Sequence, residues 1–283
     1  MWPKEFDYVR ASSVDDAIQQ TSDNTDAKIL AGGHSLLPAM KLRLSEPGKL
    51  VDISRLADLK GISANGTLSI GAMSTHAEIA ASADVQQYCA SLATACGMVG
   101  DHQVRNFGTL GGNIAHADPA SDPPTVLVAA GATIHIKRSR GERSVSAEDF
   151  FIDLFTTDLE DGEVITRIEV PNLSGHKAAY VKMPHPASRY AIVGVAVILE
   201  MDGDTCKSAR VAVGGATVSA MRASGAESAL SGSSLDDAAL NAAASAVQSD
   251  ISDALMGDVS YPESYRQAMS GVYLKRAVKA ALG

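Results

Sequence analysis

Two glycine-paired turns, far apart in the sequence, constrain this chain most. The first is Ala-Gly-Gly-His-Ser at residues 31–35, and the second is Thr-Leu-Gly-Gly-Asn at residues 109–113. Because glycine lacks a Cβ atom, such turns reach positive φ and let a ligand lie against the backbone. Successive exposed N–H groups in such turns form concave anion sites that suit a pyrophosphate. The pair therefore predicts either a dinucleotide held between the turns or two tight turns that each connect a strand to a helix.

The sequence lacks the commoner motifs of nucleotide, metal and hydrolase sites. It contains no G-x-G-x-x-G, no G-x-x-x-x-G-K-[ST], no H-E-x-x-H and no G-x-S-x-G. Its seven histidines are scattered, and His116 with Asp118 is better interpreted as part of a polar turn than as a metal site. The three cysteines form no C-x-x-C pair, whereas an iron–sulfur cluster usually needs four thiolates. We therefore expect no metal on this chain.

Charge and hydropathy argue against two kinds of partner. The chain has 24 lysines and arginines against 33 aspartates and glutamates, a net charge of −9, whereas nucleic-acid phosphates need a basic surface. The longest apolar run, at residues 191–199, is much shorter than the about 20 residues of a membrane-spanning helix. The first residues have no apolar signal core. We expect a cytoplasmic protein that binds no nucleic acid and has no transmembrane segment.

Short strands and helices alternate irregularly, which predicts an α+β fold. An acid three residues after Ser13, and again after Thr75, predicts a capping box at the start of a helix. Asn65 and Gly66 between alternating apolar residues predict a hairpin. One predicted helix carries Val85, Tyr88, Cys89, Leu92 and Cys96 on one face. The other predicted elements are strands at 27–30, 50–53, 133–137, 164–170, 190–199 and 208–213, a helix or strand at 125–130, and helices at 234–247 and 262–282, the last with Tyr265, Met269 and Val272 on one face.

The chain resembles the FAD-binding medium subunits of the molybdenum hydroxylases, of the carbon monoxide dehydrogenase and xanthine dehydrogenase types. Besides both glycine turns, the resemblance includes Arg105-Asn106, the run at residues 118–122, Lys182-Met183-Pro184 and the run at residues 189–192. It implies a two-lobed FAD-binding domain of the PCMH type at residues 1–175, with lobes at about 1–58 and 59–175. A smaller α+β domain with an antiparallel sheet and helices would follow at residues 176–283.

The resemblance also implies which residues hold the cofactor. The two turns would wrap the pyrophosphate, Asp122 would bond FAD hydroxyls, Lys182 would lie near the flavin and stabilise its reduced ring, and Tyr190 would lie close to the isoalloxazine. Val99 and Leu159 match lining positions more loosely. The full set of expected cofactor-binding residues is Leu30, Ala31, Gly32, Gly33, His34, Ser35, Leu36, Thr75, Thr109, Leu110, Gly111, Gly112, Asn113, Asp122, Leu159, Lys182 and Tyr190.

The family implies that the chain transfers electrons within a larger enzyme. A large molybdopterin subunit would hydroxylate the substrate, a small subunit with 2Fe–2S clusters would deliver single electrons to non-covalently bound FAD, and an external acceptor would receive them, in a dimer of heterotrimers. No catalytic acid or base is then required of this chain. Two alternatives remain open: a stand-alone oxidase with FAD bound covalently at His34, and a non-catalytic nucleotide-binding assembly subunit. The short segment that follows residue 175 favours non-covalent FAD over the first alternative.

Overall fold

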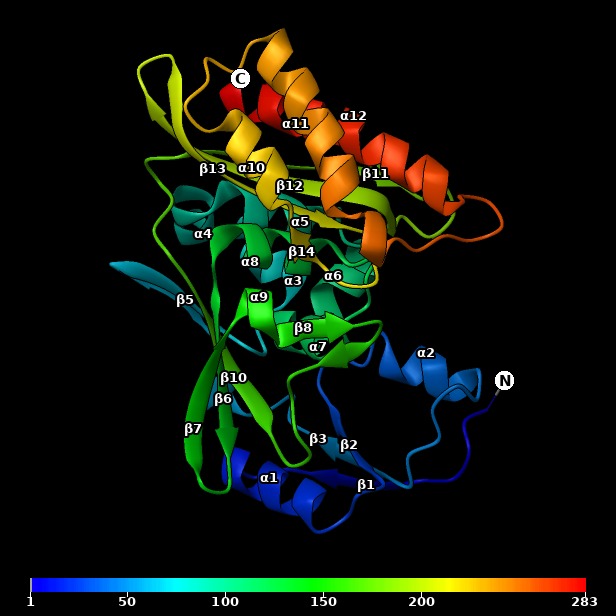
Figure 1. Cartoon of the computed structure of the whole chain (residues 1–283). Helices are drawn as coiled ribbons and strands as arrows, with labels where there is room; N and C mark the ends of the chain where they lie inside the picture. Colours follow the sequence, from blue (N-terminus) through cyan, green and yellow to red (C-terminus); the bar gives the residue numbers. More distant parts are fainter. Residues whose placement is uncertain (1) are drawn as a thin grey trace.

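A small parallel sheet forms the first lobe of the chain (Figure 1). The computed structural model describes residues 2–283. In it the strands stand in the order β1-β3-β2, and α1 packs against them. Buried side chains of this lobe, such as Ile18 and Val51, share a core with Met73 and Val164 of the next lobe. The elements are β1 (Asp7–Arg10), α1 (Val14–Ser22), β2 (Ala27–Leu30), α2 (Leu36–Lys41), β3 (Lys49–Asp52) and the 3-10 turn Ala57–Leu59.

The second lobe combines a five-stranded antiparallel sheet with a group of short helices. Its strand order is β4-β5-β10-β6-β7, and the β4–β5 hairpin turns at the predicted Asn65-Gly66. Its strands are β4 (Ile62–Asn65), β5 (Thr67–Gly71), β6 (Thr133–Arg138), β7 (Gly141–Ser146) and β10 (Val164–Val170), with a separate hairpin of β8 (Phe151–Asp153) and β9 (Thr156–Thr157). Its helices are α3 (His76–Ala81), α4 (Ala83–Tyr88), α5 (Ala90–Met98), α6 (His102–Phe107), α7 (Leu110–His116), α8 (Asp122–Ala130) and α9 (Ala147–Phe150).

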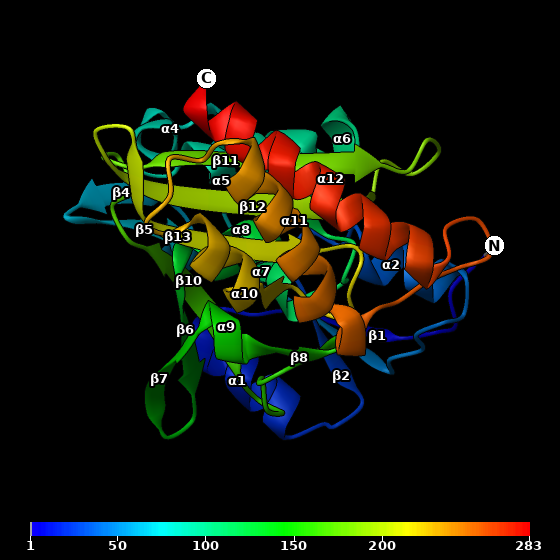
Figure 2. The same ribbon diagram turned by 45° about the horizontal axis from the view of Figure 1, so that its top comes forward.

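The C-terminal part is an antiparallel sheet with helices on both faces. Its own helices lie on the outer face, and α5 and α8 of the second lobe contact the inner face (Figure 2). Along β12, Val195 and Val197 point into the outer core while Ala196 and Ile198 join the core of the second lobe. This sheet therefore shares its buried surface with the second lobe. The elements are β11 (Lys177–Pro184), β12 (Ala191–Asp202), β13 (Thr205–Gly214), β14 (Met221–Arg222), α10 (Ser224–Leu230), α11 (Asp237–Asp250), the 3-10 turn Ser252–Ala254 and α12 (Glu263–Leu282).

Two local predictions need correction. The helix predicted through Val85 and Cys96 is broken into α4 and α5, because Cys89 between them has a non-helical backbone (φ −154°, ψ 72°). At Thr75 both halves of the capping box form. At Ser13 only the forward half forms, because the Asp16 carboxylate bonds the amide and hydroxyl of Ser12 instead.

The face predicted for the last helix is confirmed only at Met269, which packs against the core of the C-terminal part. Tyr265 and Val272 remain 38% and 37% exposed. The buried face of α12 instead includes Arg266, whose guanidinium donates to the carbonyls of Ile192, Gly215 and Tyr261 and pairs with Asp258. A buried arginine is tolerated because these acceptors satisfy it. Apolar periodicity could not show it.

In residues 2–283, no helix has the length and apolar character needed to cross a bilayer.

Candidate functional site

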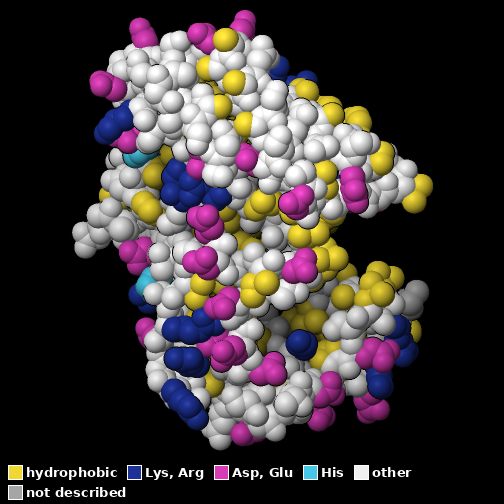
Figure 3. All heavy atoms as spheres, viewed as in Figure 1, with side chains coloured by type: hydrophobic (Ala, Val, Ile, Leu, Met, Phe, Trp, Pro, Cys, Tyr) yellow, Lys and Arg dark blue, Asp and Glu magenta, His cyan; other side chains and the backbone are white. Residues whose placement is uncertain are grey.

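A cavity of about 750 Å³ opens between the first lobe, the second lobe and the turn that joins β11 to β12. Figure 3 shows the recess between the upper and lower parts of the molecule, with apolar side chains in its floor. Its wall is drawn from the first glycine turn, the start of α7, the residues before β10 and the turn at residues 188–190. Small-molecule and cofactor sites commonly occupy about 300–1,000 Å³. The cavity is large enough for a dinucleotide.

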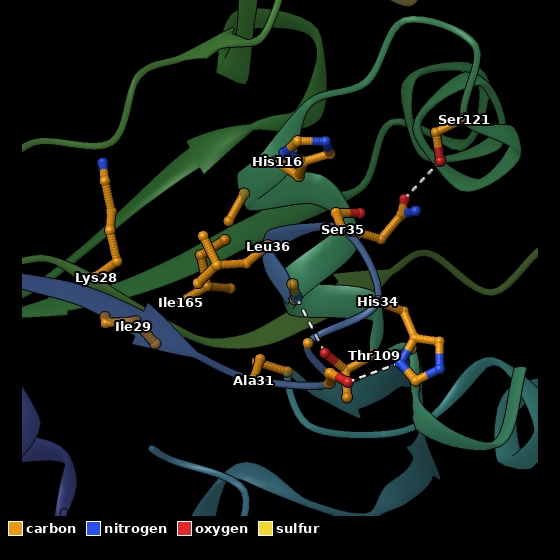
Figure 4. Close-up of a pocket in the computed structure, with 18 of the residues that line it drawn as sticks. Lys28, Ile29, Ala31, His34, Ser35, Leu36, Thr109, His116, Ser121 and Ile165 are labelled. Atoms are coloured by element: carbon orange, nitrogen blue, oxygen red, sulfur yellow. Dashed lines mark hydrogen bonds between the residues drawn. The ribbon is translucent and has the colours of Figure 1, made fainter. Parts of the chain in front are cut away.

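The first glycine turn offers unpaired N–H groups to this cavity. It begins where β2 ends and leads into α2, and Gly33 takes the left-handed conformation at φ +72°. The amides of Gly32, Gly33, His34 and Ser35 donate to no acceptor within residues 2–283. Unpaired backbone N–H groups of a turn attract anions. Figure 4 shows this turn beside Thr109 and His116.

The second glycine turn differs, because its amides are already used inside the protein. Leu110 and Gly111 donate to the carbonyls of Ser74 and Ala72 at 3.0 and 2.8 Å. Gly112 donates to Thr109 Oγ1 at 3.2 Å, and Asn113 donates to the Thr109 carbonyl at 2.9 Å. What this turn presents to the cavity is therefore its Cα surface and the Asn113 amide group, whose Oδ1 accepts from Ser121 at 2.8 Å.

The two turns need glycine because backbones approach each other there. A Cβ on Gly32 would lie 2.1 Å from the Phe107 carbonyl oxygen, and one on Gly111 would lie 2.6 Å from the Ala72 Cβ. The neighbour in each case is protein, so the constraint is on the assembly of the site rather than on space for a ligand. The Gly32 contact joins the first lobe to the residues just before Thr109.

His34 lies at this junction and points along the cavity wall. Its Nδ1 is 2.9 Å from the Gly32 carbonyl oxygen, and its ring stacks on Phe107 with centroids 5.3 Å apart and planes within 10°. The imidazole is therefore fixed at Nδ1 by its own loop and at one ring face by Phe107 of α6.

Asp122 forms a buried charged corner of the cavity. It is the first residue of α8, is 3% exposed, and accepts from Lys182 Nζ at 2.7 Å and from the Tyr180 hydroxyl at 2.6 Å. Burial raises the pKa of Asp122, opposed by the Lys182 cation and by both hydrogen bonds. Tyr190, which is 45% exposed, lines the cavity as well. Burial, together with the carboxylates of Asp118 and Asp122, raises the pKa of its hydroxyl.

His76 is a lining residue that the sequence did not single out. It is 2% exposed, and its Nδ1 is buried without a hydrogen-bond partner in the described chain. Burial lowers its pKa to about 4, and the Arg105 cation adds to the effect. The imidazole is therefore neutral at physiological pH.

Most of the expected site residues line the cavity. Those in its wall are Ala31, Gly32, Gly33, His34, Ser35, Leu36, Thr109, Gly111, Gly112, Asn113, Asp122, Leu159 and Tyr190, with Val99. Four expected residues stand outside the wall, each with a structural role. Leu30 accepts the Ile53 amide, Thr75 caps α3, Leu110 is fully buried, and Lys182 donates to oxygens behind the wall.

Sequence reasoning missed several lining residues. Lys28, Gly108, His116 and Arg189 each stand within a few residues of a predicted position. Phe155 comes from the β8–β9 turn, and residues 160–165 come from the loop before β10 and its first two residues. The alternation of side chains between the two faces of β2 could have indicated Lys28 as a lining residue. The others carry no local signal, because the path of the second lobe brings them to the cavity. Within residues 2–283, no three or more His, Cys, Asp or Glu side chains gather in a way that could hold a metal ion.

Comparison with known proteins gives matches over nearly the whole chain. Residues 4–173 match the family described as the FAD binding domain in molybdopterin dehydrogenase, and residues 178–281 match the CO dehydrogenase flavoprotein C-terminal domain. The glyceraldehyde dehydrogenase medium chain of Sulfolobus acidocaldarius is 42% identical over 253 residues, which are 89% of this chain and 90% of that one.

Solved structures agree with these sequence matches. A chain of carbon monoxide dehydrogenase from Hydrogenophaga pseudoflava superposes with a TM-score of 0.96 at 38% identity, covering 100% of this chain and 99% of that one. A chain of quinoline 2-oxidoreductase from Pseudomonas putida 86 gives 0.94 at 35% identity, with 100% and 99% covered.

The junction at Gly32 makes a first prediction. Gly32→Ala places a methyl group against the Phe107 carbonyl, so the first turn must move and the purified protein should carry clearly less FAD than one per chain. The ratio of flavin absorbance to protein absorbance measures this. Gly175→Ala is the matched control, since a Cβ there meets nothing within 4 Å. Full FAD occupancy in Gly32→Ala would show that the turn is not held by this contact.

His76 makes a prediction about acid stability. Its pKa is about 4 in the folded chain against 6.5 when unperturbed, so between these values the unfolded chain binds more protons and stability falls as the pH falls. The loss amounts to about 3 kcal/mol by pH 4. Urea unfolding at pH 7 and pH 4 should show a smaller fall for His76→Leu than for the unaltered chain. Equal falls would mean that His76 titrates normally.

Proposed function

This chain belongs to the family of FAD-binding subunits of molybdenum hydroxylases that includes the carbon monoxide dehydrogenase medium chains, and we propose that it passes electrons from 2Fe–2S clusters of a partner to an external acceptor. Members of this family are flavoprotein subunits of oxidoreductases, and FAD is their cofactor. The observation that carries the proposal for this chain is the row of unpaired amides at Gly32, Gly33, His34 and Ser35 beside the cavity.

The residues present fit FAD. Within residues 2–283, the cavity wall contains one lysine, Lys28, and one arginine, Arg189. Because two cationic side chains are few for a diphosphate, main-chain N–H groups of the first turn would supply much of the attraction. Asn113 and Asp122 would offer an amide and a carboxylate to hydroxyl groups. Tyr190 and Leu159 would give an aromatic and an apolar surface for the ring system. When bound, the flavin supplies the redox chemistry, because it exchanges electrons either singly or in pairs.

The work left to the protein is binding, orientation and electrostatics. The amides of the first turn hold the anionic end of the cofactor, with Lys28 and Arg189 as the cationic side chains of the wall. The half-exposed Tyr190 ring leaves one side of the cavity open to a partner. No proton transfer by a side chain of this subunit is needed for electron transfer alone.

The proposed assembly contains a large molybdopterin subunit and a small 2Fe–2S subunit, arranged as a dimer of heterotrimers. Relatives from Sulfolobus acidocaldarius and Hydrogenophaga pseudoflava are described as medium chains, which supports an assembly with a larger and a smaller subunit. We place the assembly in the cytoplasm, where the three buried free cysteines stay reduced. Substrate hydroxylation would take place on the large subunit.

FAD is proposed to bind without a covalent bond. His34 Nδ1 is held by the Gly32 carbonyl, and one ring face rests on Phe107, so this nitrogen and this face are occupied within the protein. The purified chain should be yellow, and acid precipitation should release the flavin into the supernatant. His34→Ala should still bind FAD, which a visible spectrum detects. A yellow pellet that turns colourless in His34→Ala would instead establish a covalent bond at His34, and a chain that binds no flavin at all would contradict the proposed function.

A further inference from the structure

Lys182 ties together three segments behind the cavity wall. Its side chain in β11 is 5% exposed. Its Nζ lies 2.7 Å from Asp122 Oδ2, 2.8 Å from the Arg189 carbonyl oxygen and 3.1 Å from the Met98 carbonyl oxygen. An ammonium group has three donors and no acceptor. All three donors are therefore used by α8, by the turn before β12 and by the end of α5, and none is left for a ligand.

Two of these segments lie side by side in the wall of the cavity. Asp122 forms one corner, and the turn with Arg189 and Tyr190 lies next to it, because Lys182 Nζ contacts both Asp122 and the Arg189 carbonyl. Arg189 has a left-handed backbone at φ +64°, which is uncommon for a residue with a side chain. The hydrogen bond from Lys182 to its carbonyl supports this conformation, together with the backbone bonds from the Arg189 amide to the His185 carbonyl and from the His185 amide to the Tyr190 carbonyl.

Tyr180 completes the arrangement from the same face of β11. It is 3% exposed, and its hydroxyl donates to Asp122 Oδ1 at 2.6 Å. Across the strand pair, Lys182 stands opposite Gly194. A Cβ on Gly194 would lie 2.5 Å from the Tyr180 hydroxyl oxygen. The glycine thus leaves the room that lets Tyr180 reach the carboxylate, and each Asp122 oxygen has its own donor.

We propose that Lys182 is a positioning residue that couples the Asp122 corner of the FAD site to the Tyr190 turn, with Tyr180 as the second support of the carboxylate, and that neither residue touches the cofactor. This inference rests on the proposed function. It replaces the expectation that the Lys182 ammonium faces the reduced ring, because the ammonium already donates to three protein oxygens.

A double-mutant cycle on the full chain tests the coupling. The variants are Lys182→Met, Tyr190→Leu and the pair, and the measurements are the FAD dissociation constant by fluorescence titration and the flavin midpoint potential. Removal of the Tyr190 ring should weaken FAD binding at least about fivefold in the unaltered background but less than about twofold beside Lys182→Met, a coupling of the size known for residues in one network. Equal effects in both backgrounds would overturn the proposal.

Two further variants control for a general structural effect. Lys177→Met removes an exposed lysine from the start of the same strand and should change neither quantity. Tyr180→Phe keeps the ring and removes one donor, so it should lower FAD affinity while the fold, measured by circular dichroism, stays the same. Unchanged affinity in Tyr180→Phe would count against the second support.

Hydrogen exchange provides a readout that needs no flavin. If Lys182 holds the turn, the amides of residues 185–191 should exchange faster in Lys182→Met and stay protected in Lys177→Met. Unchanged exchange in Lys182→Met would overturn the coupling even if that variant binds FAD poorly. If the unaltered chain binds no FAD, the proposed function fails, and the exchange result still decides whether Lys182 holds the turn.

Discussion

The close contact between Gly32 and the Phe107 carbonyl is the constraint on which the site depends. A Cβ on Gly32 would stand 2.1 Å from that oxygen, so only glycine brings the two backbones together. The contact seats the end of β2 against the loop that opens α7, and thereby places four residues with unpaired amides in the cavity wall. Unpaired amides of a turn attract an anion.

A second constraint fixes the far wall. Strand β12 is buried on both faces, with Val195 and Val197 toward its own helices and Ala196 and Ile198 toward α5 and α8. The C-terminal sheet cannot move on the second lobe without exposing this shared core. The turn before β12 carries Tyr190, so the same packing that stabilises the sheet also sets one side of the proposed flavin site.

Local sequence chemistry predicted a large part of this arrangement. The Asn65-Gly66 hairpin and the capping box at Thr75 depend on neighbours within four residues, and both formed. The break at Cys89 and the burial of Arg266 depend on packing partners distant in sequence, and both were missed. Most residues expected from family resemblance line the cavity. The internal bonding of the second turn was not expected, because glycine pairs look alike whether their amides face a ligand or a neighbouring strand.

The central claim is that main-chain amides of the first turn hold the diphosphate of FAD. The most direct test compares the dissociation constants of FAD and riboflavin for the flavin-free chain, by fluorescence titration at one ionic strength. Riboflavin keeps the ring but lacks the diphosphate and the adenosine. The account predicts that FAD binds at least about a hundredfold more tightly, since several charge-assisted hydrogen bonds are lost with the diphosphate. Equal affinities would show that the ring alone is recognised and would contradict the account.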